Sequence, residues 1–283
     1  MNNEITIVIL SHRSKNLVIN FINKIYNKFK IIIIDNSDDL DLEIEIKKNY
    51  PKVKFKFTIN NGYGSAMNFA CKYVNTKYFM INNPDIEGMN EENINRFLDT
   101  AKKLNDNFSS LGPRFINAHQ KSHIQSDEKI EIAKMKFISG ACMFFQKETF
   151  EKIGGFDENF FLYFEDSDFC IRANKINKNY QLNNIKVTHN VGSSVLVKDY
   201  KEKKELEKLT SWHFVWSKYY YYKKNYGIIL SFLYFIPTIV RIIVRISIYT
   251  ITNNHEKREK YLIRFNGLLS SIMGKKSNKR IGS

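Results

Sequence analysis

Short apolar runs alternate with helical spacings along the first part of the chain. Residues 5–10 and 31–34 are continuous, largely β-branched runs, each followed by polar turn residues. Such runs are typical of parallel strands that are covered on both faces. Between them, from Lys15 to Lys28, apolar residues recur three and four positions apart, which predicts an amphipathic helix.

The same alternation continues through the next 150 residues. Further strands are predicted at residues 54–59, 77–81, 109–115, 136–146 and 180–189, and helices at 65–73, 91–104, 147–153 and 168–177. Strand–helix–strand order predicts a Rossmann-like α/β sheet with right-handed crossovers. Ligands of such sheets bind beyond the carboxyl ends of the strands, and every one of those ends here is polar.

The C-terminal third has a different pattern. Residues 200–226 are charged and aromatic, whereas residues 228–249 are almost wholly apolar apart from a proline, Arg241 and Arg245. The uncharged core at 228–240 is shorter than the roughly 20 residues that a spanning helix needs. We therefore expect an interfacial or re-entrant helix, with a true span or a helix packed on the body or on a partner as alternatives.

Basic residues concentrate in the same region. Residues 198–283 contain 18 Lys and Arg against 6 Asp and Glu, which gives +12 of the chain's net charge of +15. A basic tail beside an apolar helix favours anionic lipid headgroups, at about 1 kcal/mol per Lys or Arg near the surface. No nucleic-acid-binding signature accompanies the charge, so no nucleic-acid partner is expected. We predict a catalytic domain over residues 1–197 and a membrane-associated helical region over 198–283.

Length and cysteine content limit the class of protein further. A chain of 283 residues with 43% hydrophobic residues can bury a sizeable core. Cys71, Cys142 and Cys170 are odd in number and lack C-x-x-C spacing, so buried reduced thiols and a cytosolic compartment are expected. The N-terminus has no basic stretch before an apolar run, so no signal peptide is expected.

An acidic cluster follows the aromatic run at residues 160–164. Glu165, Asp166 and Asp168 place three carboxylates within four positions, which near a core requires a metal, a base role or dense hydrogen bonding. Asp168 falls in the first turn of a predicted helix, where the macrodipole stabilises it structurally. Asp166 lies at the junction before that helix, where neighbouring carboxylates raise its proton affinity and suit it to act as a general base.

Polar residues at three strand ends are the other candidates. Asp85 ends an apolar strand and its turn, where it could bind a divalent cation or simply cap the turn. His189 closes a later strand; a lone histidine is more often structural, although the small polar loop after it could approach phosphate oxygens. Asp35 could bind a nucleoside or form an Asx-turn, and Asn61 with Gly62 supplies flexible backbone before a helix.

This ordered set of motifs resembles the inverting family 2 glycosyltransferases of the GT-A fold, particularly their rhamnosyltransferase-like branch. The resemblance covers residues 4–197, and its most specific parts are Asn83-Pro84-Asp85 and the 155–158 segment running into Glu165-Asp166. The matching segments are residues 31–37, 60–68, 82–85, 137–141, 154–172 and 189–194. The first strand ends in Ser11-His12, where this branch carries Tyr-Asn or a similar pair.

The resemblance implies a role for each matching residue. It implies that Asp166 is the catalytic base, that Glu165 lies near the acceptor, and that Asp85 and His189 bind Mg²⁺ or Mn²⁺. It implies that segment 139–141 lines the donor sugar. The implied nucleotide and donor contacts are Ser11, Asp35, Asn61, Gly62, Asn68, Asn83, Asp85 and Gly140.

The expected activity is sugar transfer from a nucleotide-diphosphate donor to a hydroxyl of a glycan or lipid-linked acceptor. The resemblance suggests rhamnose as one donor sugar, cell-surface polysaccharide synthesis as the setting, and the inner face of the cell membrane as the location. The alternatives are a nucleotidyltransferase of related fold and a non-catalytic membrane-bound scaffold. The first would need a basic phosphate-activating motif near the first strand, for which Ser11-His12-Arg13 is a poor substitute.

Overall fold

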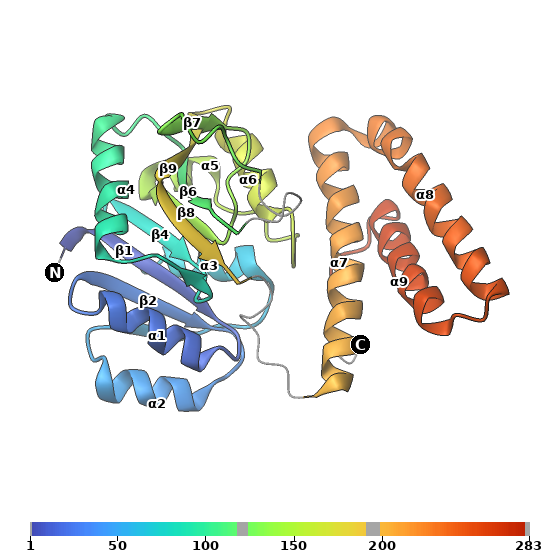
Figure 1. The fold of residues 1–283 in the computed structure, drawn as a ribbon, viewed down its shortest axis with the longest axis horizontal. Coiled ribbons are helices and arrows are strands. Elements are labelled where there is room, and N and C mark those ends of the chain that lie inside the picture. Colours follow the sequence, from blue (N-terminus) through green and yellow to red (C-terminus); the bar gives the residue numbers. More distant parts are fainter. Residues whose placement is uncertain (1, 118–123, 191–198, 281–283) are drawn as a thin grey trace. The chain divides into compact units, whose positions relative to one another are not determined.

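The computed structural model describes residues 2–117, 124–190 and 199–280. The chain divides into two compact units, drawn in Figure 1. An α/β unit contains residues 1–157 and 165–196, and a helical unit contains residues 158–164 and 197–283. The predicted domain boundary between 197 and 198 falls outside the described residues, and the short segment 158–164 joins the helical unit.

Four parallel strands form the first half of the α/β unit's sheet, in the order β3-β2-β1-β4. The strands are β1 (Asn2–Ser11), β2 (Phe29–Asp35), β3 (Lys54–Phe57) and β4 (Tyr78–Asn82). This confirms the predicted Rossmann-like half. Because β1 connects to β2 on one side and pairs with β4 on the other, the chain reverses direction across the sheet at β1, where α/β sheets bind ligands.

The second half of the sheet is mixed. After β4 come β8 (Cys142–Gln146), antiparallel to it, then β6 (Ser110–Phe115) and β9 (Asn179–His189), which run parallel to each other. Two short strands, β5 (Ile86–Glu87) and β7 (Ile132–Met135), pair antiparallel with β9. Because β8 runs against β4, its first residue lies at the same edge of the sheet as the carboxyl end of β4.

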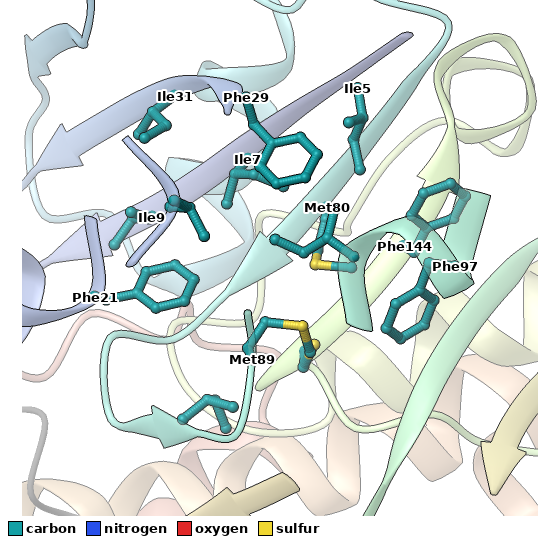
Figure 2. Packing of buried hydrophobic residues seen from close by; sticks show 14 of the residues in the cluster. Ile5, Ile7, Ile9, Phe21, Phe29, Ile31, Met80, Met89, Phe97 and Phe144 are labelled. Carbon is teal, nitrogen blue, oxygen red and sulfur yellow. The ribbon is translucent and has the colours of Figure 1, made fainter. Parts of the chain in front are cut away.

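Helices cover both faces of the sheet, so the unit has three layers. One face is covered by α1 (Lys15–Ile25), α2 (Leu40–Asn49) and α4 (Glu91–Lys103), and the other by α3 (Tyr63–Cys71), α5 (Lys147–Ile153) and α6 (Glu165–Ala173). Figure 2 shows the apolar core between the sheet and α1, α2 and α4, where Phe97 of α4 stacks on Phe144 of β8 with ring centroids 5.7 Å apart. The continuous apolar strands therefore bury both of their faces, as their composition predicts.

Five phenylalanine rings pack together on the second face. They are Phe79, Phe145, Phe150, Phe156 and Phe169, with centroid separations between 5.0 and 5.5 Å for the stacked and several of the edge-on pairs. Each such aromatic pair contributes about 0.5–1.5 kcal/mol beyond its buried area. The cluster fixes α5 and α6 to the sheet close to the acidic start of α6.

Several predicted element boundaries are wrong. The predicted strand at 136–146 exists only from Cys142, because residues 139–142 form a turn in which the Cys142 N–H donates to the Ser139 carbonyl at 3.3 Å. The predicted helix at 168–177 begins three residues earlier and ends at Ala173, which places Glu165 and Asp166 in its first turn. Helix α2 and the short strands β5 and β7 were not predicted.

The helical unit contains α7 (Tyr200–Tyr226), α8 (Ile228–Ile251) and α9 (His255–Ile272) among the described residues. Its small apolar core is formed by Val215, Tyr219, Phe235, Ile242 and Leu268. Within the described parts of the chain, α8 is the one helix that is long and apolar enough to cross a membrane.

The segment 158–164 is packed inside the helical unit by aromatic contacts. The Phe160 ring lies 4.9 Å from that of Tyr220, the Phe161 ring lies 4.7 Å from that of His213, and the Ser217 hydroxyl donates to the Leu162 carbonyl at 2.7 Å. The chain then returns to the α/β unit directly at Glu165.

Buried His213 connects this packing to the C-terminal segment. Its Nδ1 lies 2.9 Å from the Ser277 hydroxyl and its Nε2 lies 2.9 Å from the Lys279 carbonyl, while the Arg280 guanidinium covers the Phe161 ring at 3.7 Å. Burial lowers the pKa of His213 to about 4, so the ring is neutral at physiological pH. Residues 277–280 therefore contribute to the fold of this unit.

Asn68 provides a test of the packing behind α6. Its amide accepts from the Phe156 N–H and donates to the Phe156 carbonyl, both at 2.9 Å. Asn68→Ala leaves both backbone groups without these partners, so we expect a loss of roughly 2–4 kcal/mol in the free energy of unfolding by urea. The exposed variant Asn49→Ala should change it by less than about 0.5 kcal/mol. Equal stability of the two variants would contradict this role.

Candidate active site

The loop at residues 139–141 joins three parts of the site through its backbone. The Asn83 N–H donates to the Ala141 carbonyl at 2.8 Å, the Gly140 N–H donates to Asp166 Oδ2 at 2.9 Å, and the Tyr63 hydroxyl donates to the Gly140 carbonyl at 2.6 Å. A Cβ on Gly140 would lie 3.2 Å from the Asp166 Cβ, so glycine permits this close approach. The predicted residues Asn83, Gly140 and Asp166 are therefore brought together.

Asp166 and Glu165 have different environments in the first turn of α6. Asp166 Oδ2 accepts from Gly140, and its Oδ1 accepts from the Ser167 N–H at 2.6 Å. Burial raises the pKa of Asp166, and these two N–H groups oppose the rise. Glu165 is 8% exposed, and burial, followed by the charge of Asp166, raises its pKa to about 8. Glu165 is therefore protonated at neutral pH.

Asp168 has a structural role, as its position in the first turn of a helix predicts. It is fully buried and accepts from Arg172 Nε at 2.8 Å. The same guanidinium donates to the carbonyls of Ile153 and Gly155 at 2.8 and 2.7 Å. The pair thus ties α6 to the end of α5, and its charge is balanced within the fold.

Asp85 and His189, far apart in sequence, are neighbours. Strand β5 pairs with the end of β9 so that Ile86 lies opposite His189, and His189 Nε2 lies 3.4 Å from Asp85 Oδ1. Asp85 is 2% exposed, and within the described parts of the chain neither of its carboxylate oxygens has a hydrogen-bond partner. The same is true of Asn82 Oδ1, one strand position before the turn.

These atoms fit a divalent cation. A buried carboxylate without hydrogen-bond donors is costly unless a cation or a bound ligand compensates it. Carboxylate oxygen suits Mg²⁺ and Mn²⁺, and one imidazole is compatible with the latter. No group of three or more His, Cys, Asp or Glu side chains converges within residues 2–117, 124–190 and 199–280. Asp85 and His189 would therefore leave coordination positions for a diphosphate, while the predicted phosphate-contacting loop at 191–194 falls outside the described residues.

Tyr63 links the two acidic groups electrostatically. Its pKa is raised well above the usual value by burial, and further by the charges of Glu165, Asp166 and Asp85. One hydroxyl is thus within electrostatic reach of all three carboxylates. The sequence analysis missed this residue, whose signal was an aromatic hydroxyl between Gly62 and Gly64 at the start of a helix.

Four of the predicted nucleotide contacts lie at the edge of the sheet where β1, β2 and β3 end. Ser11 ends β1, Asp35 ends β2, and Asn61 with Gly62 precedes α3. Asp35 Oδ1 accepts from the N–H groups of Ser37 at 2.9 Å and Asp39 at 3.2 Å, the Asx-turn arrangement named as the alternative.

Asn68 differs from the other predicted contacts. Its amide oxygen and nitrogen both bind the Phe156 backbone, as described above, and a Cβ on Gly155 would lie 2.6 Å from that amide oxygen. A donor contact by Asn68 stays a prediction, whereas its packing role is visible in the structure.

A family comparison agrees with this geometry. Residues 6–180 match the family described as Glycosyl transferase family 2. The chain belongs to glycosyl transferase family 2.

Two curated relatives are similar to this family 2 chain. The low-salt glycan biosynthesis hexosyltransferase Agl10 of Haloferax volcanii is 25% identical over 202 residues, which cover 63% of this chain and 64% of the relative. The rhamnosyltransferase WbbL of Escherichia coli K12 is 25% identical over 199 residues, 59% of this chain and 75% of the relative. The chain thus spans slightly less than two thirds of the first relative's length.

Solved structures share the fold of this family 2 chain. The mannosyltransferase PcManGT from Pyrobaculum calidifontis, in complex with GDP-Man and Mn²⁺, has a TM-score of 0.60 at 13% identity and covers 98% of this chain and 89% of its own. S. aureus TarS 1-349 in complex with UDP-GlcNAc has a TM-score of 0.54 at 13% identity, covering 96% and 92%. The α/β unit has the GT-A fold, which confirms the predicted fold class.

The raised pKa of Glu165 predicts how stability depends on pH. Between about pH 4.5 and 8 the unfolded chain has an ionised Glu165 and the folded chain a protonated one, so folding takes up a proton and stability falls as pH rises. In metal-free buffer, Glu165→Gln should remove this contribution, and its unfolding free energy relative to the parent should increase from pH 5 to pH 8. A difference that is constant across this range would contradict the assignment.

Proposed function

We propose that this chain is an inverting glycosyltransferase that moves a sugar from a nucleotide-diphosphate donor to a hydroxyl of a glycan or lipid-linked acceptor. The observation that carries the proposal is the hydrogen-bonded connection between two acidic groups at one edge of the sheet. Asp85 with His189 provides a candidate cation site, and Asp166 provides a carboxylate held by the loop at 139–141.

Asp166 is the general base in this proposal. Its carboxylate takes the proton of the acceptor hydroxyl as that oxygen attacks the anomeric carbon of the donor. The bond from the anomeric carbon to the diphosphate oxygen breaks on the opposite face, so the configuration inverts and a nucleoside diphosphate leaves. The Gly140 and Ser167 N–H groups orient the carboxylate, and protonated Glu165 offers an O–H donor beside it.

Asp85 and His189 would hold the Mg²⁺ or Mn²⁺ ion. When bound, such an ion neutralises the diphosphate and stabilises the charge that develops on the leaving group. The backbone bond from Asn83 to Ala141 keeps the Asp85 turn next to the loop that holds Asp166. Both functions are thereby fixed by the same short loop.

The relatives support a hexose as the transferred sugar. Agl10 is named a hexosyltransferase and WbbL a rhamnosyltransferase. The structures of similar fold contain GDP-Man or UDP-GlcNAc, so a nucleotide-sugar donor agrees with the fold and with the polar strand ends. Rhamnose is retained as one candidate donor sugar, and assembly of a cell-surface polysaccharide as the setting.

The helical unit would associate with the inner face of the cell membrane. Helix α8 exposes a stripe of large apolar side chains, namely Ile229, Leu233, Ile236, Val240 and Ile243. Arg241 and Arg245 lie one turn apart on its flank, where their aliphatic stems can reach along an apolar surface and their charges can meet anionic headgroups. Lipid-linked acceptors at the same surface would then be available to the site.

Substitutions of Asp166 and Asp85 should impair different steps, transfer in the first case and metal-dependent nucleotide binding in the second. Asp166→Asn removes the base and keeps the size of the side chain, although an NH₂ group replaces one of the two oxygens that accept from the Gly140 and Ser167 N–H groups. Transfer should fall by more than about 100-fold while calorimetric binding of the donor nucleotide survives. Asp85→Ala should instead weaken nucleotide binding in the presence of Mn²⁺. Turnover of Asp166→Asn within about tenfold of the parent would exclude it as the base, and an unchanged Mn²⁺ titration of Asp85→Ala would exclude the ligand role.

Membrane association can be tested on the exposed face of α8. Ile229 and Leu233 are 73% and 55% exposed, so changing both to Asp should leave the fold intact but reduce flotation with phosphatidylglycerol-containing vesicles. The matched control is Ile44→Asp on α2, which is 63% exposed and lies outside the helical unit. Equal flotation of both variants with the parent would exclude α8 as the membrane contact.

A further inference from the structure

A line of three hydrogen-bonded side chains crosses the ends of the first three parallel strands. His12 follows β1, Asn36 follows β2, and Asn60 lies beyond β3. His12 Nδ1 lies 2.7 Å from Asn36 Oδ1, and Asn36 Nδ2 donates to Asn60 Oδ1 at 3.3 Å. The line ends at a backbone group, because the Gly62 N–H also donates to Asn60 Oδ1, at 3.4 Å.

The backbone end of this line determines the direction of every bond in it. The Gly62 N–H can only donate, so the atom of Asn60 that it meets must be the amide oxygen. Asn36 therefore meets that oxygen with its NH₂ group and presents its own oxygen to His12. That oxygen can only accept, so neutral His12 carries its proton on Nδ1 and has a lone pair on Nε2.

The loop that carries His12 is also held in place. The His12 N–H donates to the Ser14 hydroxyl at 3.3 Å, and the Arg13 N–H donates to the Ser37 hydroxyl at 2.9 Å. Asn36 is 9% exposed, whereas His12 is partly exposed. In the described parts of the chain, the His12 Nε2 and the Asn60 NH₂ group form no hydrogen bond. The line thus offers an acceptor at one end and a donor at the other.

We infer that this line selects the nucleobase of the donor, with His12 Nε2 accepting the ring N–H on the pairing edge of uracil, thymine or guanine. The inference rests on the proposed function, because it requires a nucleotide donor. The three side chains are located at the carboxyl ends of the parallel strands, where a nucleotide on this fold would lie beside the cation site. His12, Asn36 and Asn60 would thus be specificity-determining residues.

The selection follows from the polarity of the base edges. Uracil and thymine present a ring N–H between two carbonyl oxygens, and guanine presents a ring N–H beside its carbonyl oxygen. Cytosine and adenine have a ring nitrogen with a lone pair at the same place, beside an amino group. That lone pair would face the lone pair of His12 Nε2. A site built to pair with a donor discriminates strongly against a ligand that lacks it.

Nucleotide binding by the full-length chain tests the selection directly. In Mn²⁺ buffer, calorimetry with UDP, TDP, GDP, CDP and ADP should show that at least one of UDP, TDP and GDP binds about tenfold or more tightly than CDP and ADP. Methylation of the ring N–H of that nucleotide's base should weaken binding by about tenfold or more. His12→Ala should bring the affinities for that nucleotide and CDP together, whereas Asn49→Ala on α2 should preserve their ratio.

The tautomer of His12 can be measured without any bound nucleotide. Ring-¹⁵N NMR of the histidine-labelled protein above neutral pH should show the His12 proton on Nδ1, with the signal identified by its loss in His12→Ala. Asn36→Ala should convert it to a mixture of both tautomers. A parent protein with the His12 proton on Nε2 would overturn the inference.

The outcomes separate this inference from the proposed function. If CDP or ADP binds as tightly as UDP, TDP and GDP, or if methylation of the ring N–H has no effect, while the protein still releases nucleotide from a nucleotide-sugar, the base selection is wrong and the transferase function stands. If none of the five nucleotides binds with Mn²⁺ and no nucleotide-sugar is turned over, both are overturned.

Discussion

The hydrogen bonds of one three-residue loop hold the candidate site together. Residues 139–141 accept from the Asn83 turn, donate to the Asp166 carboxylate and accept from the Tyr63 hydroxyl. These bonds join the end of β4, the start of α3 and the start of α6, three elements whose positions the two cores of the sheet already fix. The loop comes close to α6 at Gly140, where an added Cβ would lie only 3.2 Å from the Asp166 Cβ and would require the neighbouring side chain to shift. A small change in this loop would therefore move both the candidate base and the candidate cation site.

The chain reaches the acidic residues through unfavourable backbone conformations. Tyr163 and Phe164, directly before Glu165, have φ values of +67° and +68°. A non-glycine residue in the left-handed region costs of order 1–3 kcal/mol, so this conformation persists only where other contacts determine it. On one side those contacts are the aromatic packing and the Leu162 bond within the helical unit. On the other side they are the Asp168–Arg172 pair and the phenylalanine cluster of the α/β unit. These two φ values therefore mark the end of the 158–164 segment, directly before the first turn of α6.

The sequence predicted the strands and helices that depend on local patterns of apolar and charged residues. Continuous β-branched runs predicted the parallel strands, and the charge and hydropathy of the last third predicted a helical region distinct from the catalytic domain. The strand predicted at 136–146 was wrong because Phe137 and Ile138 continue the apolar pattern, whereas the turn at 139–141 depends on Tyr63 and Asp166, which are distant in sequence. The packing role of Asn68 could not be predicted from the sequence, because its partner Phe156 is 88 positions away. The residue pattern alone gave Asp85 and His189 as separate candidates, and the family resemblance implied that both bind one cation; the β5–β9 pairing is what makes them neighbours.

The environments of the three clustered carboxylates explain how adjacent acids can have different functions. Asp168 is neutralised by Arg172 and is fully buried, so it is not available to a substrate. Glu165 is buried, and its raised pKa keeps it protonated near neutral pH. Because Glu165 is then uncharged, Asp166 is not paired with a second negative charge, and two N–H groups favour its ionised form. Environments that separate the protonation states of neighbouring acids in this way suit the roles that we propose, Asp166 as base and Glu165 as hydrogen-bond donor. The different roles proposed for these acids therefore depend on the packing around α6 and not on the acidic motif alone.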